Sequence, residues 1–226
     1  MTVSIFYTTG QLDGTATRNS GDAGNTWANQ RDGDGTTQAN SGGVVYTLQY
    51  IKLQMGTTNN QYNNFTRGFF GFDTSDIGAA DTIDSATFSL CLKAGDQAED
   101  WGGNADLVQS TIISGTSAVA ADYQGTVGNT TLQAASIPFS SLVADDATFN
   151  VWTLNSTGRG NINKSGVTYL GTRGSYDTSD SQRTYISQYK QDLMTGHNSN
   201  EDVSGDKRPK LTVTHTSPFT PKAIMF

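Results

Sequence analysis

Cysteine, charge and glutamate are all scarce in this sequence, and each shortage excludes a class of protein. Cys91 is the only cysteine among 226 residues, which rules out an intrachain disulfide and a cysteine-based metal cluster. Only 15% of the residues are charged and the net charge is −7, so the Lys and Arg clusters that attract nucleic acids or anionic membranes are missing. The start of the chain lacks a secretory-type segment, and no stretch approaches a membrane span. We therefore expect synthesis in a cytoplasm, without nucleic acid or membrane as a partner.

Turn-forming and β-branched residues make up much of what is present. The chain has 25 glycines and abundant Thr, Ser, Asn and Asp, whereas Glu99 and Glu201 are the only glutamates. Good helix formers are scarce, and 10% of the residues are aromatic. This composition predicts an all-β protein with long loops, because the aromatic content argues against disorder.

The clearest strand is the stretch "IDSATFSLCLKA", residues 83–94. Its apolar residues recur at every second position, so they share one face of a strand: Ala86, Phe88, Leu90 and Leu92. The same alternation places Cys91 on the more polar face. Just upstream, Phe70 and Phe72 point the same way along a second strand, which is predicted to end at Asp73.

Further short strands follow the same pattern between turn signals. Roughly ten strands, with turns about every 8 to 15 residues and no helical period, indicate a β-sandwich or jelly roll. The stretch "NSTGRGNINKSG" is predicted to hold one short helical turn at most. We predict a single antiparallel β-sandwich (jelly roll) over residues 1–216, followed by an extended apolar tail over residues 217–226.

Four segments, taken in order, resemble a known family. They are "NTWANQRDGDGTT", "RGFFGFDTSDIGAADTIDSATFSL", "NVWTLNSTGRGNINKSGVTYLGTRGSYD" and "KRPKLTVTHT". Their succession is similar to the DNRLRE-type jelly-roll domains, relatives of carbohydrate-binding modules that occur in bacterial surface proteins and bacteriophage particles. The resemblance implies a jelly-roll fold, and function only loosely, because sandwiches host many unrelated functions.

Catalytic motifs are absent from the sequence. His197 lies in a predicted loop and His215 in the last predicted strand, and no Gly-x-Ser-x-Gly turn or metal-type histidine spacing accompanies them. We predict that both histidines are structural or solvent-facing. No motif singles out a pair of catalytic carboxylates among the many aspartates. The chain is therefore not expected to be an enzyme.

Two aspartate pairs are candidate calcium ligands. Asp32 and Asp34 in "RDGDGTT", and Asp177 and Asp180 in "SYDTSDSQ", offer the hard oxygen atoms that Ca²⁺ prefers. The alternative is that all four are ordinary turn residues, which hydrogen-bond to their own backbone.

Aromatic and apolar residues supply two further kinds of candidate site. Trp27 and Trp101 are candidates for stacking on sugar rings, with burial in the core as the alternative. The tail ends on apolar side chains that are predicted to dock on another subunit, or on the open end of the same domain: Phe219, Ile224, Met225 and Phe226.

These observations favour a non-catalytic structural protein of a bacteriophage particle. The expected role is an exterior capsid decoration, head-fibre or tail-associated subunit, made in the host cytoplasm, with other virion proteins and copies of itself as partners. An acidic chain suits the outside of a particle, because a subunit packed against DNA should be basic. The alternative is a glycan-binding module or adhesin, with a surface glycan of the host as ligand. A hydrolase using paired aspartates is a third hypothesis.

Overall fold

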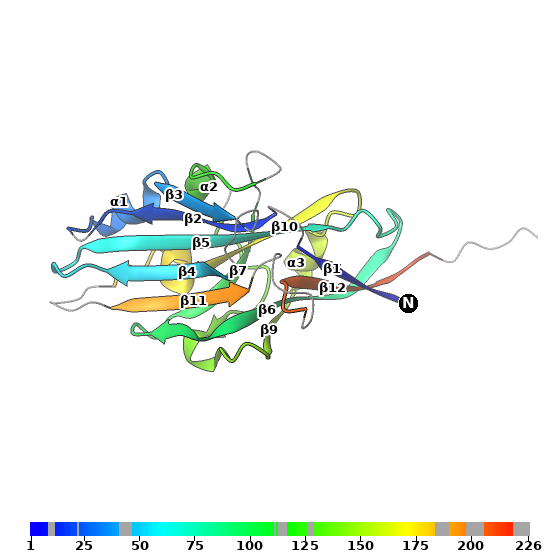
Figure 1. Ribbon diagram of the computed structural model, residues 1–226. Coiled ribbons are helices and arrows are strands. Elements are labelled where there is room, and N and C mark those ends of the chain that lie inside the picture. The colour runs from blue at the N-terminus through cyan, green and yellow to red at the C-terminus, as the bar shows by residue number, and fades with distance from the viewer. Residues whose placement is uncertain are drawn as a thin grey trace, which may run out of the picture.

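The computed structural model describes residues 1–8, 12–21, 23–40, 47–110, 112, 117–125, 129–183, 190–197 and 206–218 (Figure 1). Its strands are β1 (Thr2–Tyr7), β2 (Asp13–Asn19), β3 (Thr37–Asn40), β4 (Thr47–Met55), β5 (Tyr62–Asp73), β6 (Thr82–Glu99), β7 (Asn104–Gln109), β8 (Ile137–Pro138), β9 (Phe149–Thr153), β10 (Val167–Gly174), β11 (Gln191–His197) and β12 (Lys210–Thr216). Its helices are short: α1 (Trp27–Asp32), α2 (Asp122–Gly125), α3 (Ser156–Gly160), α4 (Ser175–Thr178) and the 3₁₀ turn Phe139–Ser141.

The described strands form one curled antiparallel sheet. Their order is β1-β12-β6-β11-β4-β5-β10-β7-β8, with β2 and β3 attached beside β5, and β9 beside β6. All pairs between these described strands are antiparallel. The prediction of an all-β fold of the sandwich or jelly-roll type is confirmed.

Strand β6 joins the two parts of the curled sheet. Its first half pairs with β12 and β9, and its second half pairs with β11. The predicted burial of one face of β6 is confirmed, because Ala86, Phe88, Leu90 and Leu92 are each at most 2% exposed. Phe88 lies opposite Leu211 of β12 and Trp152 of β9, and its ring packs against Phe70 from β5. The main core therefore lies between β5 and the β6–β9–β12 part of the sheet.

Cys91 departs from the expected polar environment. It is fully buried, although it lies on the face of β6 opposite to Phe88 and Leu90. Its cross-strand partner is Phe149 of β9. This part of β6 is buried on both faces. Alternation in the sequence therefore predicted the wrong environment for the Cys91 thiol, because the pattern does not show what covers the second face of a strand.

Strand β5 ends at Asp73, as predicted, and its two faces have different character. On one face, Asn64 and Thr66 precede Phe70 and Phe72, so this face begins polar and ends in the main core. On the other face, Phe65 and Phe69 flank Arg67. A fully buried arginine in the middle of an aromatic strand requires polar partners from other elements.

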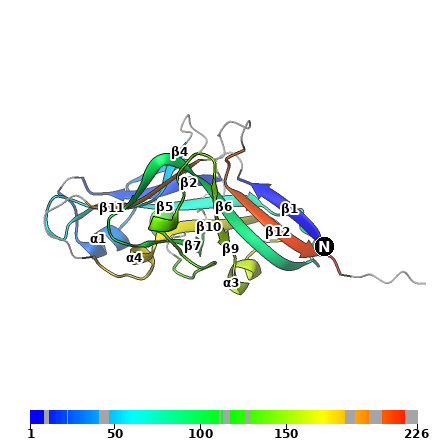
Figure 2. The same ribbon diagram turned by 90° about the horizontal axis from the view of Figure 1, so that it is seen from below.

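Helices α1 and α4 lie at one end of the molecule, and the pair β1–β12 lies at the other (Figures 1 and 2). The sequence predicted the single turn α3, which is confirmed, but it did not predict α1 or α4. Helix α1 starts after Thr26, whose side chain accepts a hydrogen bond from the Asn29 N–H at 3.3 Å. The predicted calcium-binding segment "RDGDGTT" therefore begins in the last two residues of this helix, Arg31 and Asp32.

Several predictions fall on residues that the structure does not describe. The apolar tail residues Phe219, Ile224, Met225 and Phe226 all lie outside the described residues. Within the described part of the chain, none of the helices has the length and apolar character needed to cross a membrane.

Candidate functional site

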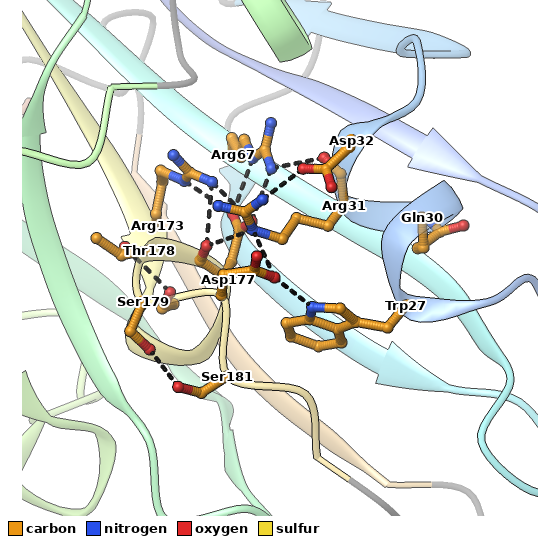
Figure 3. A network of polar contacts seen from close by, with 12 residues as sticks. Trp27, Gln30, Arg31, Asp32, Arg67, Arg173, Asp177, Thr178, Ser179 and Ser181 are labelled. Atoms are coloured by element: carbon orange, nitrogen blue, oxygen red, sulfur yellow. Dashed lines mark hydrogen bonds and ion pairs between the residues drawn. The ribbon is translucent and has the colours of Figure 1, made fainter.

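Three of the four predicted calcium aspartates, Asp32, Asp177 and Asp180, lie in a polar network that joins α1, β5, β10 and α4 (Figure 3). At its centre is Asp177, which is 1% exposed. Both of its carboxylate oxygens accept hydrogen bonds from Arg67, at 2.7 and 2.8 Å, and from Arg173, at 2.7 and 2.9 Å. Each arginine is also 1% exposed. We call these three residues the Arg–Asp–Arg cluster, in which two bidentate guanidinium groups hold one carboxylate.

The charges of the cluster decide the ionisation of Asp177. Burial acts to raise its pKa, but the positive charges of Arg67 and Arg173 outweigh burial and hold the pKa well below the usual range. Asp177 is therefore a carboxylate at every ordinary pH. Its oxygens already face Arg67 and Arg173, and Arg31 Nε lies 3.8 Å from Oδ1. Asp177 is therefore an ion-pair partner inside the protein and not an accessible calcium ligand.

The other three predicted metal ligands are arranged differently. Asp180 accepts a hydrogen bond from the Trp27 indole N–H at 2.8 Å, and Asp32 forms an ion pair with Arg31. Asp34 is exposed, and its main-chain carbonyl accepts from Arg18. Among the described residues, no group of three or more His, Cys, Asp or Glu side chains converges on a point that could hold a metal ion.

The two predicted sugar-stacking tryptophans are buried, each with only 5% of its surface exposed. The Trp27 ring packs edge-on against Tyr62 and Phe65, with ring centres 5.1 Å apart in both pairs. Trp101 lies against Tyr62 and Tyr176. The alternative of burial in the core therefore holds for both tryptophans, and neither ring offers an exposed face to a sugar, because removing these large apolar surfaces from water is favourable.

A polar cleft of about 230 Å³ crosses the polar beginning of β5. We call it the amide cleft, because four of its six lining residues carry side-chain amides: Asn19, Gln54, Asn63 and Asn64, together with Gly21 and Lys52. Asn64 lies directly between Asn19 on β2 and Gln54 on β4, so the register sets three amides in a row across three strands.

Two oxygens in the amide cleft are unusual. Gln54 Oε1 and Asn63 Oδ1 are buried and have no hydrogen-bond partner among the described residues. Their side chains are 7% and 9% exposed. Burial also lowers the pKa of the half-buried Lys52 ammonium group. Buried acceptors beside a half-buried cation need hydrogen-bond donors, which water or a polar ligand in the cleft would supply.

Both histidines are buried and each contacts an aspartate. His197 Nε2 lies 2.8 Å from Asp146 Oδ1, and His215 Nδ1 lies 2.6 Å from Asp81 Oδ2. The sequence predicted structural or solvent-facing histidines, but it did not predict that each would contact an aspartate. The sequence signal was weak, since 51 residues separate the first pair and 134 separate the second.

At the end of the molecule opposite α1 and α4, the edge strand β1 presents apolar side chains to solvent. Val3 is 61% exposed and Ile5 is 52% exposed, whereas Phe6 is buried. Among the described strands, β1 pairs only with β12. Strand β12 leads directly to Ser217 and Pro218, the last described residues (Figures 1 and 2). We call Val3, Ile5 and the outer backbone of β1 the β1 edge.

Comparison with known proteins returns no match for this chain, either among protein-family models or among curated protein sequences.

Proposed function

We propose that the chain is a structural protein of a bacteriophage particle, an exterior capsid decoration, head-fibre or tail-associated subunit that docks onto other particle subunits or copies of itself. The all-β body supports this proposal, and so do the acidic composition and the resemblance of four sequence segments to jelly-roll domains of such particles.

The observation that carries the proposal is the β1 edge. An edge strand offers unpaired N–H and C=O groups to another chain, and soluble proteins usually protect such edges with charges or proline. Here the outward side chains are Val3 and Ile5, and both are more than half exposed. Burying such a side chain contributes about 1.5–3 kcal/mol when burial is complete. In the sequence, the apolar tail follows strand β12, the neighbour of β1, and we expect the tail and the β1 edge to dock on the same partner.

The test is incorporation into particles. Val3→Asp combined with Ile5→Asp, and separately deletion of residues 217–226, should each reduce the amount of the chain on purified particles. The matched control is Val151→Asp, which charges a similarly exposed valine (47%) on β9. Incorporation at the wild-type level in both β1-edge and tail variants contradicts the docking role.

Glycan binding is a second candidate function, which the amide cleft favours. Side-chain amides each carry a donor and an acceptor, a combination that matches neighbouring sugar hydroxyls. Hydroxyl donors of a sugar would satisfy Gln54 Oε1 and Asn63 Oδ1. This assignment moves the predicted glycan site from the buried Trp27 and Trp101 to the amide cleft.

Titration of purified chain against a panel of bacterial polysaccharides tests this second function. We expect Asn64→Ala and Lys52→Ala each to weaken binding by about tenfold, the loss of one hydrogen bond to the ligand. Lys93→Ala is the matched control, since Lys93 is an exposed lysine on β6, outside the cleft. The absence of saturable binding by the wild-type chain contradicts a glycan site here.

A further inference from the structure

Ser4, His215 and Asp81 form a hydrogen-bonded chain of side chains near the β1 edge. Ser4 Oγ lies 3.1 Å from His215 Nε2, and Asp81 Oδ2 lies 2.6 Å from His215 Nδ1. His215 is 6% exposed and Asp81 is 8% exposed, whereas Ser4 is partly exposed. The hydroxyl therefore lies nearest to solvent and the carboxylate is enclosed.

The sheet brings these three residues together from distant parts of the sequence. Strand β12 lies between β1 and β6, so His215 has Thr2 opposite it on one side and Ile83 on the other. Ser4 is two residues beyond Thr2 and shares its face. Asp81 directly precedes β6, and the β6–β12 register shifts between Thr214 and His215.

The order of contacts matches the chemistry of an activated serine. The hydrogen bond from His215 holds the pKa of Asp81 below its ordinary value, so Asp81 is ionised and accepts the Nδ1–H. That tautomer leaves the lone pair on Nε2 facing the Ser4 hydroxyl. A nucleophile, a base in contact with it and a carboxylate that orients the base define a catalytic triad by geometry, whatever their order in the sequence.

We propose that Ser4 is the nucleophile of a serine hydrolase site for small carboxylic esters, with His215 as general base and Asp81 as the residue that positions His215. This activity goes beyond the assembly role and does not depend on it.

The reaction follows the usual two stages of acyl transfer. Ser4 Oγ bonds to the ester carbonyl carbon while its proton moves to His215 Nε2. The C–O bond to the alcohol then breaks, and the alcohol oxygen takes that proton, which leaves an acyl group on Ser4. Water attacks this acyl group as His215 accepts one of its protons, and the acid departs as the proton returns to Ser4 Oγ.

A cavity of about 360 Å³ adjoins Asp81 and the start of β6. Its lining combines the apolar Ile83 and Ile162 with two cations, Arg159 and Lys164. Lys164 donates to the Asp81 main-chain carbonyl at 2.8 Å, so this lysine is tied to the same turn that carries the positioning carboxylate. The cavity adjoins the triad through Asp81, and its lining does not include Ser4 or His215. A small ester is the simplest acyl donor for a serine on an edge strand, which is why the substrate class is a small ester.

A fluorophosphonate probe, which reacts covalently with activated serines, tests the proposal on the intact chain. Trypsin releases residues 1–18 as one peptide, and Ser4 is the only serine within it. We expect mass spectrometry to find this peptide modified in the wild type and unmodified in Ser4→Ala. In His215→Asn the labelling rate should fall by about 100-fold or more, which is the contribution of a general base.

The matched control is His197→Asn, which disrupts the other His–Asp pair and should leave the labelling of residues 1–18 unchanged. A purely structural role of the same hydrogen bonds, clamping β1 to β12, predicts an unmodified peptide in the folded wild type. That result overturns the proposal, and it does not require any variant to fold. Equal labelling of the wild type and a folded His215→Asn also overturns it. Hydrolysis of p-nitrophenyl acetate that Ser4→Ala abolishes would support it.

Discussion

Asp177 and Asp192 are both enclosed by protein, but their partners differ. Asp177, at 1% exposure, contacts two guanidinium groups, and its pKa is held well below the usual range. Asp192 on β11, at 0% exposure, accepts hydrogen bonds from the main-chain N–H groups of Asp100 and Trp101, at 3.1 and 3.0 Å. Burial raises the pKa of Asp192 to about 6, because these amides only partly offset the loss of water.

This difference shows what a buried carboxylate needs in order to stabilise the fold. A buried carboxylate beside full positive charges is stabilised in its ionised form. A buried carboxylate beside main-chain amides is less well stabilised when ionised, so its pKa rises. The first arrangement ties α4 to β5 and β10, and the second joins β11 to the end of β6.

The largest effect is expected from breaking the Arg–Asp–Arg cluster. Asp177→Asn leaves Arg67 and Arg173 buried without a counter-charge, so the free energy of unfolding should fall by about 3–5 kcal/mol. Because the pKa of Asp177 lies below that of the unfolded chain, its stabilisation is complete above about pH 4 and is lost only at lower pH. Urea denaturation at pH 5 and at pH 8 should therefore give the same loss. A loss below about 1 kcal/mol would mean that the cluster contributes no more than an exposed ion pair.

The contribution of Asp192 to stability should change with pH in the opposite direction to that of Asp177. Its pKa rises from 3.8 in the unfolded chain to about 6, so the folded state binds more protons between these values, and stability falls as the pH rises through this window. Asp192→Asn keeps the acceptor oxygen without the charge. We expect this variant to match the wild type near pH 4 and to exceed it at pH 7 by up to about 3 kcal/mol. Denaturation at both pH values measures the difference, and a variant that is less stable than the wild type at pH 7 contradicts the assignment.

A third test concerns how closely the backbone approaches Asp192. A Cβ atom on Gly103 would lie 2.5 Å from Asp192 Oδ2 and 3.1 Å from the Tyr176 ring. Gly103→Ala should therefore destabilise the fold by about 1–3 kcal/mol through overpacking. Gly160→Ala is the matched control, because nothing lies within 4 Å of its added Cβ. Equal melting temperatures of the two variants would show that the contact at Gly103 relaxes freely.

The smallest effect is expected at the solvent-exposed border of the polar network. The Asp32 side chain is 54% exposed where it pairs with Arg31. Asp32→Asn should change the free energy of unfolding by less than about 1 kcal/mol, because water screens an exposed pair. A change as large as that of Asp177→Asn would show that the network acts as one unit.

Strand positions could be predicted because they depend on local alternation. The strand between Thr82 and Glu99 and the strand that ends at Asp73 follow from apolar residues two positions apart. Helix α1 was missed because its six residues are too few to show a helical period.

The site residues were harder to predict because their partners are distant. Asp177 was selected as a hard oxygen ligand, but Arg67, which occupies that oxygen, lies 110 residues away in the sequence. Similarly, 211 residues separate Ser4 from His215, so no local sequence motif predicts that they are in contact. Tail residues 219–226 lie outside the described part of the chain, and their predicted docking stays a prediction.

Residue order alone determined the strand-rich body, since hydrophobic alternation and a shortage of helix formers act over a few neighbouring positions. The chemical role of each aspartate depends on the tertiary structure, because the curled sheet places it beside an arginine, a histidine or main-chain amides. Ionisation depends on the charges and the water within a few ångströms, and those neighbours are set by strand pairing across the whole chain.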